Sequence, residues 1–397
     1  MINVAPLADV FEFIRNGKSV KQDESTGGLP ITRIETIADG TVDCSRVGYA
    51  GLQKQGNEKW LLQRGDILFS HINSVEHIGK CALFEGHPEN LIHGMNLLAL
   101  RPKKQVLDAR YAYRAMSSPN FRASLQQFVN KAVNQASIST TNLKSLVISL
   151  PPLGEQRRIA AILDKADALR RKRERVLDLL DNLAEAIFLE IFGDPVSNPK
   201  GLPVVKLGSI VSKIGSGATP KGGDAAYKRT GISLVRSMNV RDEGFLSKGL
   251  AFIDDTQAAK LANVTLEPDD VLLNITGASV ARVCLCPAEI LPARVNQHVS
   301  IIRPKDKSLN AFLAAALKMP AMKAKLLGVA ESGATRQAIT KAQIEEVAVP
   351  LPPSDQVLKY QELTERQHIA RGLVVKSMEV DNSLFSALQS RAFSGQL

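Results

Sequence analysis

The sequence predicts an α+β protein in which two similar mixed α/β domains are separated by a pair of long helices, packed as an antiparallel coiled coil. Three observations predict this architecture. The chain has 397 residues, which is too many for one ordinary core. It repeats itself at an offset of 200 to 204 residues, and each repeat closes with a long helical pattern. The hydrophobic fraction of 44% supplies enough apolar side chains for real cores and excludes a disordered chain.

The internal repeat is clearest at the end of each half. Residues 148–156 (ISLPPLGEQ) return as residues 349–356 (VPLPPSDQ), and residues 65–70 (GDILFS) match residues 269–274 (DDVLLN). Only two copies exist, which indicates a duplicated domain and excludes a solenoid. Two unrelated α+β domains of equal length are the alternative, but they would not keep the offset constant.

The repeat divides the chain into four segments. We expect a first mixed domain at 1–150, a central long helix at 151–195, a second mixed domain at 196–351 and a C-terminal long helix at 352–397. Short apolar runs bounded by Gly, Pro, Asn and Asp predict the strands of each domain. The Pro-Pro pair marks each helix entrance, because proline is tolerated at the start of a helix and not inside it.

Apolar residues in both long segments recur in steps of three and four, which is typical of a coiled-coil seam. Neither helix can bury this stripe alone, so we expect the two to pack antiparallel as a rod. The 37 residues of 155–191 would span about 55 Å at about 1.5 Å per residue. The predicted spacer and docking positions are Gln156, Ile159, Ile162, Leu169, Arg173, Val176, Leu180, Leu183, Leu363, Leu373, Val380 and Leu384.

Charge and composition narrow the class of partner. The formal net charge is +10, which favours binding to a polyanion. Aromatic residues make up 5% of the chain, which is few for a surface that binds single-stranded nucleic acid by base stacking. The densest basic run is 170–175 (RRKRER). It is either a charged flank of the coiled coil or a surface facing DNA or an acidic partner.

Localisation is expected to be cytoplasmic. No run of about 18 apolar residues and no basic-then-apolar leader is present, so neither a membrane span nor export is predicted. Four irregularly placed cysteines suit a reducing compartment.

No catalytic motif is visible, and we expect no catalytic residue, no metal and no cofactor in this chain. An adenine methyltransferase motif (Asn/Asp-Pro-Pro-aromatic) and a phosphate-binding loop are both missing. The Gly-rich segment 215–220 is interpreted as a plain turn. The group His77, Cys81, His87 and His93 is close in sequence, but such residues are more often surface or core side chains than zinc ligands.

Two diverged basic domains on a fixed rod favour a protein that reads two different short sequences on one duplex at a set separation. Identical domains would demand a palindrome, whereas these would read an asymmetric, bipartite site. Two alternatives remain open, namely an enzyme with an unrecognised site and a standalone coiled-coil scaffold.

The order of domain, residues 150–160 (LPPLGEQRRIA), long helix, second domain and second long helix resembles the specificity subunit of type I restriction–modification enzymes. The resemblance covers the whole chain, although 354–356 (SDQ) replaces the Gly-Glu-Gln form in the second half. It implies a non-catalytic subunit of a bacterial or archaeal complex whose two target recognition domains bind double-stranded DNA.

The resemblance also implies the partners. Two methyltransferase (modification) subunits would bind S-adenosylmethionine and methylate adenine N6, and two restriction subunits would add ATP- and Mg²⁺-dependent translocation and cleavage. The paired helices would set the gap between half-sites and dock the modification subunits.

Readout in the major groove uses Arg or Lys for guanine and Asn or Gln for adenine, so polar turns of both domains are the candidates for DNA contact. Arg33 and Arg236, like Lys80 and Arg282, are basic at equivalent positions and are expected to contact phosphate, because shared residues cannot distinguish two half-sites. The candidates are Lys18, Lys21, Arg33, Lys54, Lys59, Asn73, Lys80, Lys131, Asn134, Gln135, Ser216, Thr219, Lys221, Lys228, Arg229, Arg236, Asn239, Arg241, Thr276, Arg282, Arg336 and Gln337.

Overall fold

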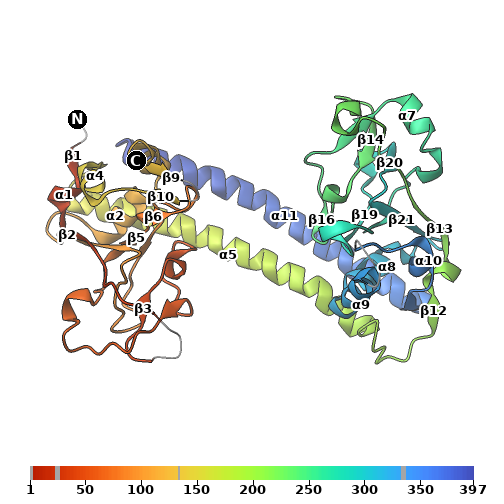
Figure 1. Ribbon diagram of the computed structural model, residues 1–397, viewed down its shortest axis with the longest axis horizontal. Helices are drawn as coiled ribbons and strands as arrows, with labels where there is room; N and C mark the ends of the chain where they lie inside the picture. Colours follow the sequence, from red (N-terminus) through yellow and green to blue (C-terminus); the bar gives the residue numbers. More distant parts are fainter. Residues whose placement is uncertain (1–2, 23–26, 133–134, 332–336) are drawn as a thin grey trace. The chain divides into compact units, whose positions relative to one another are not determined.

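The structure is a computed structural model that describes residues 3–22, 27–132, 135–331 and 337–397 (Figure 1). It consists of two compact units. Unit 1 contains Met1–Glu174 and Lys376–Leu397, and unit 2 contains Arg175–Val375. Each unit therefore holds one mixed domain together with one end of each long helix.

Unit 1 is built around a four-stranded antiparallel sheet of order β2-β8-β5-β7, with α2 and α3 among the helices that supply its core. Its elements are β1 (Val4–Pro6), α1 (Leu7–Val10), β2 (Phe11–Asn16), β3 (Ile31–Thr32), β4 (Val47–Gly48), β5 (Ile67–Phe69), β6 (Ile72–Asn73), β7 (Cys81–Leu83), β8 (Leu98–Pro102), α2 (Ala109–Met116), α3 (Pro119–Gln126), β9 (Asn130–Ala132), β10 (Gln135–Ser137), α4 (Thr140–Ser145), β11 (Val147–Ser149) and the start of α5 (Leu153–Phe192).

Unit 2 repeats this plan with the sheet β13-β21-β18-β19, and adds a three-stranded sheet β17-β14-β20. Its elements are β12 (Val204–Lys206), α6 (Leu207–Ile210), β13 (Val211–Ser216), β14 (Ile232–Val235), β15 (Val240–Arg241), β16 (Gly244–Phe245), β17 (Ala251–Ile253), α7 (Asp255–Ala259), β18 (Val271–Asn274), β19 (Val283–Leu285), β20 (Ala293–Val295), β21 (Val299–Pro304), α8 (Leu309–Lys318), α9 (Pro320–Glu331), α10 (Lys341–Glu345), β22 (Ala348–Pro350) and the start of α11 (Ser354–Phe393).

One ion pair explains why the two halves share particular residues. In unit 1 the Arg101 guanidinium donates from Nε and Nη2 to the two carboxylate oxygens of Asp66, both at 2.7 Å. In unit 2 Arg303 makes the same pair with Asp270 at 2.7 and 2.6 Å. Both carboxylates are fully buried, so each needs this bidentate partner to offset its loss of water.

The long helices pack antiparallel within each unit. In unit 1 Arg173 pairs with Asp381 at 2.6 Å, and Arg170 lies over the Phe385 ring. In unit 2 Gln367 donates to the Leu180 carbonyl at 2.9 Å and Arg371 pairs with Asp181. The coiled-coil pairing expected from the sequence is therefore present.

The predicted register of the seam is partly wrong. The side chains of six predicted seam residues are between 40% and 66% exposed. The less exposed positions of α5 lie one residue later, at Arg170, Leu177 and Ala184. A count of apolar residues passes over this face at Arg170, whose guanidinium is bound by Asp167 and lies over the Phe385 ring. The exposed residues are Leu169, Val176 and Leu183 in α5, and Leu373, Val380 and Leu384 in α11.

The other predicted spacer residues lie closer to the helix interface or the cores. Ile159 is buried in the unit 1 core, and Arg173 forms the ion pair above. Ile162, Leu180 and Leu363 are half-buried. Among the described residues, no helix is long and apolar enough to cross a membrane.

Candidate nucleic-acid interface

The sheet of unit 2 brings four polar segments to one edge. β13 ends at Ser216, β18 ends at Asn274 and β21 begins at Val299, and the antiparallel register places these three ends together. Thr276 then forms a bridge with Ala338, and the Gly277 amide donates to the Gln337 carbonyl at 3.1 Å. The turns that contain Thr219, Thr276 and Gln337 therefore converge, as one recognition surface requires.

Unit 1 forms the equivalent edge from equivalent strand ends. Asn16 at the end of β2 and Phe69 at the end of β5 both lie opposite Leu98, the first residue of β8. The hairpin of β9 and β10 reaches this edge, because Ala136 pairs with Asn73 of β6. Lys18, Asn73 and Lys131 thus share one end of the unit 1 sheet.

A repeated glycine allows the first turn to lie close to the next segment. A Cβ at Gly17 would overlap the carbonyl oxygens of His93 and Gly94, and a Cβ at Gly217 would overlap the Val295 carbonyl. Only glycine permits this approach of two backbones. The turns that follow, at Lys18 and Thr219, are therefore held against the edge in both units.

Several predicted contacts are already engaged within the protein. The Lys18 ammonium donates to Asn57 Oδ1 at 2.6 Å, and Lys80 donates to the Ala38 carbonyl at 2.8 Å. Arg33 donates to Gln22 Oε1, and Arg236 donates to the Gly249 carbonyl. These four cations are half-buried and fix local loops, which limits their freedom to follow a phosphate backbone.

One prediction is wrong because of burial. Asn239 is fully buried, where its Oδ1 accepts from the Arg236 amide and its Nδ2 donates to the Leu246 carbonyl. The remaining candidates differ in exposure. Lys21, Lys54, Lys59, Lys131, Ser216, Lys221, Lys228, Arg229, Arg241 and Gln337 are exposed, whereas Asn73, Thr219, Thr276 and Arg282 are half-buried.

Three candidates cannot be placed. Asn134 and Arg336 lie outside the described residues, and only the backbone of Gln135 is described, as the first residue of β10.

Two residues at the unit 2 edge were not predicted. Gln297 and His298 form the tip of the turn between β20 and β21, and they bond to Thr219 and Thr276. No motif in the sequence marks either residue, and His298 is an isolated histidine there. The signal that could have found them is the repeat, since Met95 and Asn96 hold the same turn in unit 1.

The basic run 170–175, in the middle of α5, contributes to the fold of unit 1. Asp167 is buried and accepts from Arg114 at 3.0 Å, from Arg170 at 2.9 Å and from Arg171 at 3.1 Å. Burial would raise the pKa of Asp167, but the charges of Arg114 and Arg171 and the hydrogen bonds from the arginines lower it. The ionised carboxylate therefore ties α2 to α5, which favours the structural interpretation of this run.

His93 and Cys81 of unit 1 are buried side chains, whereas His77 and His87 are exposed. His93 lies between the carbonyls of Trp60 and Asn16, and burial lowers its pKa. The Cys81 thiol lies 3.2 Å from the Ser117 hydroxyl, and burial raises its pKa to about 11. In the part of the chain that the structure describes, no group of three or more His, Cys, Asp or Glu side chains could hold a metal.

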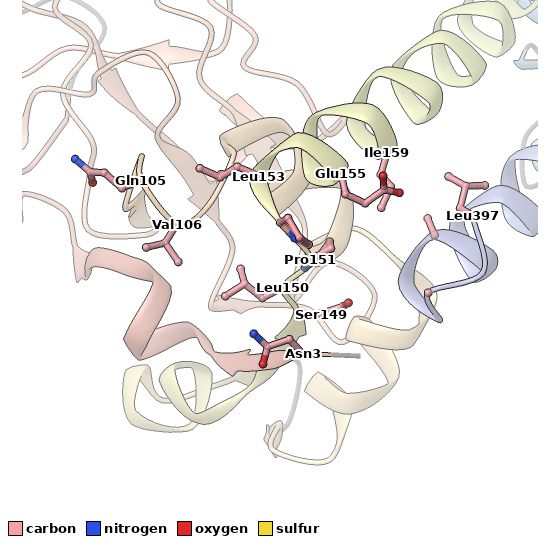
Figure 2. A pocket seen from close by; sticks show the side chains of 13 residues that line it. Asn3, Gln105, Val106, Ser149, Leu150, Pro151, Leu153, Glu155, Ile159 and Leu397 are labelled. Atoms are coloured by element: carbon pink, nitrogen blue, oxygen red, sulfur yellow. The ribbon is translucent and has the colours of Figure 1, made fainter. Parts of the chain in front are cut away.

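A cavity of about 690 Å³ lies in unit 1 where α5 begins (Figure 2). Leu150, Pro151, Ile159 and Leu397 line it, with Asn3 at its lower end. Gln156 is buried. Its side-chain oxygen accepts from the Asp108 backbone amide, and its side-chain nitrogen donates to the carbonyls of Val106 and Pro151. These residues join the Pro-Pro turn to the domain, at the opposite end of the sheet from the polar edge.

The chain matches a known protein family twice, once in each half. The chain matches the family described as "Type I restriction modification DNA specificity domain" over residues 2–178 and again over residues 199–372. It is 33% identical over 375 residues to the "Putative type I restriction enzyme MjaX specificity subunit" of Methanocaldococcus jannaschii, covering 89% of this chain and 83% of that protein. It is also 32% identical over 185 residues to the EcoKI specificity subunit of Escherichia coli K12, covering 45% of this chain and 40% of that protein.

Solved structures share the fold. The S subunit of the type I restriction–modification system from M. genitalium aligns with a TM-score of 0.62 at 14% identity, covering 99% of this chain and 96% of that one. A chain from a study of complex assembly of the type I system aligns with a TM-score of 0.59 at 17% identity, covering 100% and 98%. Because the family match covers both halves and the Methanocaldococcus jannaschii relative aligns over most of its length, the chain belongs to the family of type I restriction–modification DNA specificity subunits.

Proposed function

We propose that this chain chooses the DNA sequence at which a type I restriction–modification complex acts, and that it catalyses no reaction itself. One observation carries the proposal. In each unit the equivalent strand ends meet at one edge of the equivalent sheet. The turns at this edge carry different side chains, because Met95 and Asn96 of unit 1 stand where unit 2 has Gln297 and His298. Two diverged edges suit two different half-sites of an asymmetric, bipartite motif on double-stranded DNA.

The chemistry belongs to the partners. Methylation of adenine N6 requires the base to be extruded into a catalytic pocket. We assign that pocket and S-adenosylmethionine to two methyltransferase subunits. Where two restriction subunits are also present, they would supply ATP- and Mg²⁺-dependent translocation and cleavage. This chain would position the complex at its target sequence on the DNA duplex, in the cytoplasm of its host.

The long helices are proposed to set the gap between half-sites and to dock the methyltransferase subunits. Their exposed apolar side chains support docking. In unit 2 these include Val176, Leu179 and Leu183 of α5 and Ile369 and Leu373 of α11, all at least 40% exposed. Apolar side chains grouped on charged helices are typical of surfaces that a partner covers.

Substitution of Leu183 and Leu373 by Gln tests this docking role. Because both side chains are exposed, the free chain should keep its unfolding midpoint. Binding to the methyltransferase subunit, measured by calorimetry, should weaken at least about tenfold. Substitution of the exposed Leu358 of unit 2 by Gln is the matched control. Equal affinity of wild type and the double variant would remove these side chains from the interface.

Single-molecule methylome sequencing tests the specificity role. Cells with and without this gene should differ by one bipartite N6-methyladenine motif with a fixed gap, lost on deletion and restored by the gene in trans. Persistence of every motif would contradict the proposal. Incubation of the purified chain with S-adenosylmethionine and plasmid DNA tests the alternative of an unrecognised enzyme, because methyl transfer by this chain alone would contradict a non-catalytic role.

A further inference from the structure

The turn at the tip of the unit 2 edge carries a chain of hydrogen bonds between side chains. Thr219 donates to Gln297 Oε1 at 2.5 Å, and the Gln297 amide nitrogen lies 3.1 Å from His298 Nε2. His298 Nδ1 lies 2.5 Å from the Thr276 hydroxyl. These four residues come from three separate turns, so the bonds link the turns that converge at the edge.

The proton positions follow from chemistry. An amide nitrogen only donates, so His298 Nε2 must accept, and the neutral ring then carries its proton on Nδ1. That proton is donated to Thr276 Oγ1. Each partner therefore fixes the next, and the direction of the Gln297 amide is set by Thr219 on one side and by His298 on the other.

Gln297 keeps half of its hydrogen-bonding capacity. A glutamine amide offers two N–H donors and two acceptor lone pairs on its oxygen. Thr219 and His298 use one acceptor position and one donor, which leaves one of each. Gln297 is exposed, so the remaining pair is available to a ligand. A donor and an acceptor on one planar amide match the N7 and N6 groups of adenine in the major groove.

The equivalent turn of unit 1 has the same backbone and different chemistry. The Leu97 amide donates to the Gly94 carbonyl at 3.2 Å, and the Val299 amide donates to the Asn296 carbonyl at 3.4 Å. Met95 and Asn96 are therefore the counterparts of Gln297 and His298. Met95 is exposed and cannot form a bidentate bond to a base edge. Residues that differ at one shared position are the ones that can distinguish two half-sites.

We propose that Gln297 reads an adenine edge in the half-site bound by unit 2, and that Thr219 and His298 are positioning residues that hold its amide for this contact. The inference rests on the proposed function and adds a residue and a base to it. The adenine is one that stays stacked in the duplex, because a base extruded for methylation cannot present its edge in the groove.

The test uses the full chain with its methyltransferase subunit, in cells that lack the chromosomal copy. Methylome sequencing of the wild type first defines the motif. In Gln297→Ala, one adenine position in one half of the motif should become degenerate, with discrimination at that position falling about 5- to 150-fold. In Gln297→Glu the same position should shift from adenine to cytosine, because a carboxylate accepts from cytosine N4.

Three comparisons complete the test. The other half of the motif should be unchanged in each variant, which shows that the complex is intact. Gln105→Ala, which changes an exposed glutamine in the turn that follows β8 of unit 1, should leave both halves unchanged. Thr219→Val should reduce discrimination at the same adenine position, and Thr219→Ser, which keeps the hydroxyl, should restore it.

The outcomes separate the two proposals. An unchanged motif in both Gln297 variants overturns this inference and leaves the specificity role standing, as does a change at a base other than adenine. A wild-type chain whose presence adds no motif overturns the proposed function itself.

Discussion

The buried ion pair of Asp66 and Arg101 should stabilise unit 1, and the fluorescence of Trp60 can report its loss. The side chain of Asp66 is 2% exposed and that of Arg101 is 16% exposed. Asp66 accepts two hydrogen bonds from the Arg101 guanidinium and a third from the backbone N–H of Gln63 at 2.8 Å. In Asp66→Asn one of these donors faces an NH₂ group, and the arginine loses its counter-charge.

The size of the effect follows from burial. Breaking a buried ion pair by removing one partner typically costs about 3–5 kcal/mol, and one lost charge-assisted hydrogen bond costs about 1.5–3 kcal/mol. Because Arg101 keeps some contact with water, we expect Asp66→Asn to lower the free energy of unfolding of unit 1 by about 2–4 kcal/mol. The double variant with Arg101→Met should cost less than the sum of the two single variants.

Trp60 is the single tryptophan of the chain and lies in unit 1, so its fluorescence reports that unit during urea unfolding. The expected result is an earlier midpoint for Asp66→Asn. The matched control is Asp270→Asn, which breaks the same pair in unit 2 and should shift the Trp60 transition less. A loss below about 1 kcal/mol in Asp66→Asn, or an additive double variant, would refute the reasoning.

Two further predictions concern titratable groups. Burial raises the pKa of Cys81 to about 11 and the pKa values of Cys284 and Cys286 to about 12, so only the exposed Cys44 should react with a thiol reagent near neutral pH in the native chain. All four should react after denaturation, and fast reaction of more than one native thiol would contradict the burial. The pKa of Asp167 is lowered on folding, so its contribution to stability is present above the unfolded pKa and is lost as pH falls through the folded pKa, that is, below roughly pH 4. Wild type should therefore lose stability there more steeply than Asp167→Asn in acid unfolding followed by Trp60 fluorescence.

The duplication was predictable from sequence because the residues that build each core recur at a nearly constant offset. Asp66 with Arg101 and Asp270 with Arg303 show the reason, since a buried bidentate pair restricts both positions. The Pro-Pro turn before each long helix was predictable for a similar reason, because proline is confined to helix entrances.

The helix register and the site were less predictable. Leu169 is apolar and exposed, while Arg170 lies over Phe385, so a count of apolar residues selects the wrong face. Asn239 is a plausible base reader by type, yet its amide holds two backbone groups in the interior. The role of Gln297 depends on three turns that are distant in sequence, and only the packed sheet brings them together.

Exchange of residues 1–150 tests the central claim most directly. These residues would be replaced by the corresponding segment of a relative with a different motif, and the methylome would be sequenced in cells that also express the methyltransferase subunit. The account predicts that one half of the bipartite N6-methyladenine motif changes, while the other half and the gap stay as they were. A motif that stays unchanged, or that changes in both halves, would contradict it.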